Sequence, residues 1–234
     1  MMISKSDHAR IAEAVKAAEA GSSGEIFCIV TAEVSQYREI PLAWASATAL
    51  ILPPLLVAFG LQPWALVSRF LPVSAERAWA TGSGPSVAQT VAENLGAYAV
   101  AQAIIFAVVA LIVSLPPVRR ALTPQSLKRH RVKRMAQGHF ISTGLINDPD
   151  RTGVLIFASL KDRQVEIVAD KAIHDAVGGK VWDSSVSALV AGMKRRQPGQ
   201  GFVEAINICG AALAEHFPTS GPHDNRFSDE LIEV

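Results

Sequence analysis

Charged residues are scarce in this chain. Only 18% of its 234 residues are charged, against about 25% in an average soluble domain, and 50% are apolar. This composition excludes a disordered or highly solvated chain. Lysine and arginine total 22 while aspartate and glutamate total 21, and the net charge of +1 also excludes a protein that coats nucleic acid through its overall charge.

Cysteine is nearly absent, and the sequence motifs of common active sites are missing. Cys28 and Cys209 both stand among apolar neighbours. That setting is typical of buried, reduced thiols and not of a disulfide framework or a zinc site, so it indicates a reducing compartment. The chain also lacks a serine nucleophile elbow and a glycine-rich phosphate loop, which lowers the expectation of an enzyme.

Two long stretches contain no charged residue at all. Residues 41–61 and 95–115 span 21 residues each. A helix of that length reaches about 30 Å, which is the hydrocarbon thickness of a bilayer. We therefore predict a transmembrane hairpin over residues 37–118, with an external loop between its two spans. Two buried helices of a soluble protein are the alternative.

Positive charge is distributed unevenly around this hairpin. The loop between the spans carries two cations, Arg69 and Arg77, whereas the outer flanks carry eight. Because positively charged residues favour the cytoplasmic side, both termini are expected in the cytoplasm and the hairpin in a bacterial inner membrane.

Five of the flanking cations follow the second span within one short run. Their position next to the membrane predicts contact with anionic lipid headgroups. No aromatic stacking residues or reading helix support nucleic acid as a partner, and another membrane protein is a further candidate. The five cations are Lys128, Arg129, Arg131, Lys133 and Arg134.

The remaining chain predicts one α/β domain in two pieces, residues 1–36 and 119–218. The first piece carries only a helix and a strand, which cannot bury their apolar faces alone, so it is expected to pair with the second piece. Residues 219–234 are expected to be a polar, loose tail. The predicted elements are a helix from Ser4, a strand over 25–31, a basic helix from Pro124, strands over 153–159 and 164–170, and helices over 181–196 and 201–217.

Several short motifs together resemble the TPM-domain family. They are SSGEI at 22–26, RMA at 134–136 with Phe140, TGVLIFAS at 152–159, VEIVAD at 165–170, Trp182 and AEHFP at 214–218. The resemblance covers residues 4–36 and 125–218. It implies a Rossmann-like α/β sandwich without a dinucleotide fingerprint, split here by a two-helix transmembrane hairpin. It also implies, for some members, acid-phosphatase activity or divalent-cation binding, although His174 stands where the family pattern places a glutamate.

Three carboxylates are candidate ligands for a hard cation: Glu25, Asp150 and Asp170. If residues 161–162 form a tight turn, the two strands that they join pair Asp170 with Gly153. A right-handed crossover between parallel strands then brings Glu25 to the same end of the sheet. Carboxylate oxygens are the ligands that Ca²⁺ and Mg²⁺ prefer. The alternatives are a helix cap for Asp170, a turn for Asp150 and a solvated or lysine-paired Glu25.

These features favour an integral inner-membrane protein whose cytoplasmic domain is a binding or scaffolding module. The alternative is a divalent-metal-dependent, acid phosphatase-like hydrolase that uses the three carboxylates. No residue receives a catalytic role from the sequence.

Overall fold

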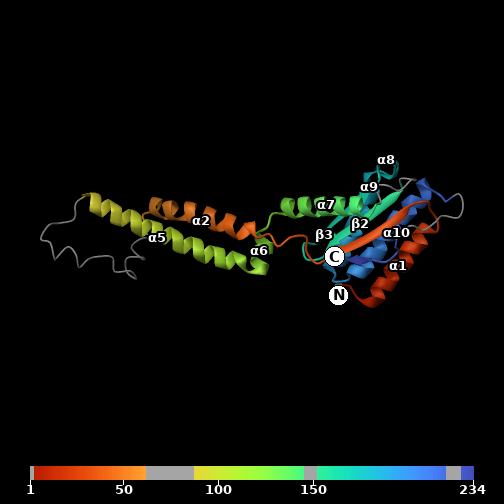
Figure 1. Ribbon diagram of the computed structural model, residues 1–234, viewed down its shortest axis with the longest axis horizontal. Coiled ribbons are helices and arrows are strands. Elements are labelled where there is room, and N and C mark those ends of the chain that lie inside the picture. The colour runs from red at the N-terminus through yellow and green to blue at the C-terminus, as the bar shows by residue number, and fades with distance from the viewer. Residues whose placement is uncertain (1–2, 62–86, 145–151, 220–227) are drawn as a thin grey trace. The chain divides into compact units, whose positions relative to one another are not determined.

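The chain folds as two compact units. A computed structural model describes residues 3–61, 87–144, 152–219 and 228–234 (Figure 1). The first unit comprises Met1–Gln36 and Pro124–Val234, and the second comprises Tyr37–Thr123. The first is mixed α/β and the second is helical.

A four-stranded mixed sheet forms the centre of the first unit. Its strands lie in the order β3-β2-β1-β4. β1 pairs in parallel with both β2 and β4, whereas β2 and β3 are antiparallel. β1 and β2 are buried along their whole length, as expected for central strands with near-continuous apolar sequences. The strands are β1 (Glu25–Thr31), β2 (Gly153–Ser159), β3 (Gln164–Ala169) and β4 (Ile232–Glu233).

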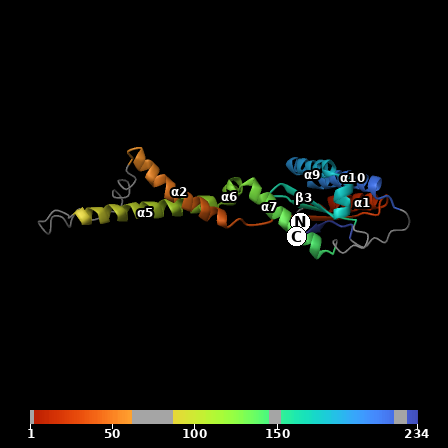
Figure 2. The same cartoon turned by 90° about the horizontal axis from the view of Figure 1, so that it is seen from above.

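Helices cover both faces of this sheet (Figure 2). Alternate residues of a strand point to opposite faces. Phe27 and Ile29 of β1 accordingly pack with Val132 and Phe140 of α7, while Cys28 lies in the larger cluster that α1, α9 and α10 complete. The helices described in this unit are α1 (Lys5–Glu19), α7 (Gln125–Ser142), α8 (Lys171–Val177), α9 (Gly179–Lys194) and α10 (Pro198–His216).

The predicted elements of the α/β unit are largely confirmed. β2 begins and ends where the apolar run does, and β3 pairs with it in the expected register, with Val154 opposite Ala169. The turn between them is longer than expected, because residues 160–163 form it instead of residues 161–162, but the register is unchanged.

The prediction of a loose C-terminal tail is wrong for its last residues. Ile232–Glu233 forms β4 beside β1, and the Val234 N–H donates to the Val30 carbonyl at 2.9 Å. Leu231 is buried in the core. A strand of two residues has no periodic signal of its own, because its conformation depends on the strand that it joins.

In its described residues, 37–61 and 87–123, the second unit contains two long apolar helices and one short helix. The helices are α2 (Glu39–Ala58), α5 (Val87–Ser114) and α6 (Pro116–Leu122). α2 packs along α5, and the Gln102 side chain donates from Nε2 to the Ala49 carbonyl at 3.2 Å.

Length and composition would let α2 cross a bilayer. Residues 98–114 of α5 pass the same test only when joined to α6, from which they are bent by 97° at residue 115. One helix of the described chain is therefore long and apolar enough for a membrane span, or two if the bent pair counts as one span.

Candidate functional site

The predicted carboxylates are placed where β1 and β2 begin and β3 ends. Glu25 of β1 lies opposite Gly153 of β2, and the Asp170 N–H donates to the Gly153 carbonyl at 3.0 Å. The expected pairing of Asp170 with Gly153 is confirmed, and Glu25 reaches the same sheet end. Asp150, the third predicted ligand, lies outside the described residues.

Glu25 and Asp170 lie on either side of Gly153, which has no side chain. Strand alternation puts Glu25 on the same face as Phe27, and Asp170 on the same face as Val168. Both belong to the face that α7 covers. Their Cα atoms are two strand spacings apart, about 10 Å, with Gly153 between them. Glu25 is only 1% exposed, so its carboxylate is held in the interior.

A further carboxylate, Glu19, interacts with this sheet end. Its Oε1 accepts the Ile26 N–H at 2.8 Å. Burial raises the pKa of Glu19 to about 8; the Ile26 hydrogen bond lowers this pKa, whereas Glu25 and Asp229 raise it. Glu19 therefore tends to hold a proton near neutral pH. Five residues separate α1 from β1, and this short reversal is the only sequence signal that could have placed Glu19 here.

Hydrogen bonds fix the segment that precedes β1. The Thr152 hydroxyl donates to the Ser23 carbonyl at 2.8 Å, and the Ser23 N–H donates to the Phe217 carbonyl at 2.9 Å. Ser22 also forms an isolated β-bridge with Pro218. The SSGEI and AEHFP motifs, distant in sequence, are thus in direct contact.

The residues that follow β3 do not add a third ligand. Asp170 occupies the N-cap position of α8, and Asp175 forms an ion pair with Lys171 one turn away. That hydrogen bond lowers the pKa of Asp175, whose side chain is 58% exposed. His174 is exposed. Across the described ranges, no group of three or more His, Cys, Asp or Glu side chains could hold a metal ion.

Two of the five predicted membrane-facing cations turn out to be engaged within the α/β unit. Lys128 is 7% exposed, although the sequence predicts it at a membrane surface. The Arg131 guanidinium donates to the Ser35 hydroxyl, just beyond β1. A helix rotates about 100° per residue, so a dense run of cations on it cannot share one face.

The other three cations lie on exposed parts of α7. Arg129 and Lys133 interact with Glu166 of β3, while Arg134 is 2.9 Å from the His130 ring through Nη2. Burial raises the pKa of Glu166, and Lys133 and Arg129 oppose that shift. Arg129 and Lys133 are one turn apart and share the side of α7 that faces Glu166, whereas Arg134 lies on a different side of the helix, so the three do not form one patch.

The two cysteines lie in the core, as the sequence predicted. Both thiols are free and buried. Burial raises the pKa of each, that of Cys209 to about 11, and the Ser185 hydroxyl lies 3.2 Å from the Cys209 sulfur. Neither thiol is suited to act as a nucleophile, because the thiolate is the reactive form.

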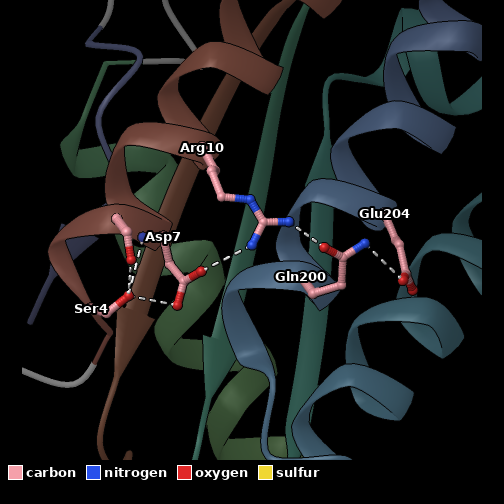
Figure 3. Close-up of polar contacts among 6 residues, drawn as sticks. Ser4, Asp7, Arg10, Gln200 and Glu204 are labelled. Carbon is pink, nitrogen blue, oxygen red and sulfur yellow. Dashed lines mark hydrogen bonds and ion pairs between the residues drawn. The ribbon is translucent and has the colours of Figure 1, made fainter.

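A polar chain joins the first part of α1 to α10 (Figure 3). Ser4 caps α1, since its hydroxyl accepts the Asp7 N–H at 3.1 Å. Asp7 pairs with Arg10 at 3.3 Å, and Arg10 donates to the Gln200 side-chain carbonyl. Gln200 donates in turn to Glu204 at 3.2 Å. One ion pair and the hydrogen bonds of Gln200 thus connect α1 to α10.

Comparison with known proteins bears on the fold. No protein-family model matches the sequence, and no curated protein matches it. Among solved structures, the chain is similar to the NMR structure of the BA42 protein from the psychrophilic bacterium Bizionia argentinensis, with 16% sequence identity and a TM-score of 0.54. That alignment covers 99% of this chain and 95% of the other. At this identity the similarity shows a related fold alone.

Proposed function

We propose that this chain is an integral protein of the bacterial inner membrane. In this proposal α2 and α5 cross the bilayer, and the α/β unit is a binding or scaffolding module at the cytoplasmic face. One observation carries it: α2 contains an apolar stretch of 18 residues, yet only 28% of this stretch is buried inside the protein. An apolar core helix of a soluble protein would be mostly buried.

The side chains that α2 and α5 leave uncovered support a lipid environment. Each large apolar side chain left in water forfeits about 1.5–3 kcal/mol of burial free energy, and lipid removes that penalty. On these helices and directly after them, the large apolar side chains with more than half of their surface exposed are Leu42, Leu50, Ile51, Phe59, Leu61, Leu95, Leu111 and Leu115.

The contact between the two helices is also of a membrane type. Apart from Ile40, the buried positions of α2 recur every four residues at Pro41, Ala45, Ala49 and Pro53, and two of these are the small residue alanine. Small residues allow helix backbones to approach closely, and this contact is a common basis of helix association in lipid. The interhelical bond from Gln102 satisfies a polar side chain that lipid could not solvate.

The orientation and the domain class belong to the same proposal. Eight flanking cations against two in the loop favour cytoplasmic termini. The pairing of β1, which precedes the hairpin, with β2, which follows it, suits a TPM-like Rossmann sandwich split by two spans that return the chain to one side. The cations near the second span would attract anionic headgroups, since this attraction acts across a Debye length of about 8 Å and needs no single patch.

Alkaline extraction of membranes tests the spanning hairpin. Leu50→Lys places a charge near the middle of α2, on a side chain that is 66% exposed. In lipid this costs about 3 kcal/mol of insertion free energy, whereas at a water-facing position it would be close to neutral. Met135→Lys is the matched control, because it makes the same kind of change at an exposed apolar side chain of α7.

The proposal expects the wild type and Met135→Lys to stay in the membrane pellet after carbonate washing, and Leu50→Lys to be depleted from it. A wild-type chain that washes free and remains monodisperse in buffer without detergent would refute it.

A metal-dependent phosphatase is the second candidate function. The observation in its favour is the placement of Glu25 and Asp170 on one face, on either side of Gly153. With Asp150 these carboxylates would hold Ca²⁺ or Mg²⁺, which would supply electrostatic stabilisation to a phosphoryl group. The chain's own groups would orient the substrate, and Glu19 would keep a proton near neutral pH.

Calorimetric titration with Ca²⁺ and Mg²⁺, beside a phosphomonoester assay, separates the two functions. Asp170→Asn is the test variant, and Asp175→Asn is the control because its carboxylate is exposed and paired with Lys171. Loss of cation binding and turnover in Asp170→Asn alone would favour the hydrolase. The absence of both in the wild type would remove it.

A further inference from the structure

In the described residues, no strand pairs with the outer edge of β3. β3 is the last strand on its side of the sheet, and the Asp170 N–H donates inward to Gly153. Because ladder bonds alternate along an antiparallel strand, the N–H and C=O groups of Val165, Ile167 and Ala169 point away from β2. Within the described parts of the chain, no hydrogen bond reaches these outward groups.

This edge lacks three of the usual protections against strand pairing, and Glu166 is the one charged residue of β3. Exposed edge strands commonly carry proline, lysine or a bulge that blocks a neighbouring strand. The sequence QVEIVA of β3 has none of these residues, and all six of its positions pair with β2 without a bulge. An added strand would find a complete row of donors and acceptors.

The two faces beside this edge differ in chemistry. On the α7 face, the exposed side chains of Arg129 and Lys133 stand one turn apart and interact with Glu166, which leaves a net charge of about +1. On the opposite face, Ile167 and Ala169 are half-buried and pack against the main apolar cluster. A strand beside β3 would therefore need acidic side chains on one face and apolar side chains on the other.

Charge decides between a second copy of the chain and a different partner. Two copies joined by their β3 edges would bring two pairs of Arg129 and Lys133 to one seam, against only two Glu166 carboxylates. An acidic segment would instead neutralise the excess positive charge. We propose that the β3 edge binds an extended acidic segment of a partner protein by strand addition, with its acidic side chains under Arg129 and Lys133.

Fluorescence anisotropy with an alternating Val-Asp hexapeptide tests this proposal on the full chain in detergent. The acidic peptide should bind at least about tenfold more tightly than the matched Val-Lys peptide. Arg129→Glu should weaken its binding about fivefold, whereas Arg134→Glu, an exposed cation paired with His130, should leave binding unchanged.

Backbone methylation distinguishes strand pairing from charge attraction without altering the protein. Only alternate N–H groups of an added strand face β3, so N-methylation of one alternate set should abolish binding while the other set is tolerated. Equal binding of both methylated peptides would overturn the proposal. Equal displacement of both peptides by phosphatidylglycerol vesicles would overturn it as well, because it would show that only charge holds them. Equal binding of the acidic and basic peptides would also overturn it, and so would a dimer of the chain that pairs through β3.

Discussion

Gly210 lies where α10 packs tightly against α1, and replacing it with alanine should destabilise the α/β unit. A Cβ at Gly210 would lie 2.5 Å from the Cβ of Ala18 and 3.1 Å from its Cα. Carbon atoms in good contact are about 3.5–4.0 Å apart, so α1 would have to retreat by about 1 Å. Neither contacted atom can rotate away, because one is backbone and the other is bonded to it.

The size of the effect follows from two opposing terms. Overpacking of this kind costs about 1–3 kcal/mol, and the rigid contact favours the upper half of that range. Exchanging glycine for alanine inside a helix returns about 1 kcal/mol. Gly210→Ala should therefore lose about 1–2 kcal/mol. Gly138→Ala in α7, where an added Cβ meets nothing within 4 Å, should gain about 1 kcal/mol.

Pulsed thiol labelling in urea measures this change in the intact, detergent-solubilised chain. The chain has two cysteines, and both are buried in the core of the α/β unit, so labelling reports the opening of that unit alone. With a slope of about 2 kcal/mol per M urea, the midpoint of Gly210→Ala should fall by about 0.5–1 M. The second change Ala18→Gly should recover part of this loss. If Gly210→Ala were as stable as Gly138→Ala, the close packing of α1 on α10 would be refuted.

Three further predictions use the same labelling assay. Folding raises the pKa of Glu19 from 4.5 to about 8, so its stabilising effect is complete below about pH 4.5 and is lost as the pH rises through 8. Because Glu19 is partly exposed, Glu19→Gln should stabilise the fold by only about 1 kcal/mol at pH 9 and hardly at pH 5; equal effects at both pH values would contradict this assignment. Ser4→Ala removes the cap of α1 and should cost about 1 kcal/mol, and an unchanged midpoint would contradict that role. Asp175→Asn breaks an exposed ion pair and should change the midpoint by less than its error, whereas a large loss would contradict its solvent screening.

The central strands were predictable because burial on both faces demands a continuous apolar sequence. Residues 153–159 meet that demand, and β2 occupies the same residues. The register of β3 followed from the turn between the strands, even though that turn is four residues long, because both turn lengths preserve the same facing pairs. The position of Glu25 at the same sheet end as Gly153 followed from a crossover between parallel strands, whereas their direct pairing is known only from the structure.

Other features depend on contacts that no local pattern encodes. β4 exists because β1 offers an edge and because the Glu233 carboxylate accepts the Ile3 N–H at 3.0 Å. Glu19 joins the carboxylates at the sheet end only through the path of the chain between α1 and β1. A helix wheel would have separated the cations of α7, but the burial of Lys128 required knowledge of the sheet beneath it.

The transmembrane hairpin is tested most directly by introducing three cysteines one at a time and measuring on which side of the membrane each one reacts. Glu13→Cys and Gln137→Cys lie at exposed positions on α1 and α7, and Ser83→Cys lies in the sequence between the two proposed spans. The buried native thiols give little background. An impermeant maleimide should label Ser83→Cys in intact cells, and the other two only after the inner membrane is opened. Labelling of Glu13→Cys and Gln137→Cys from opposite sides would contradict a hairpin that returns the chain to one compartment.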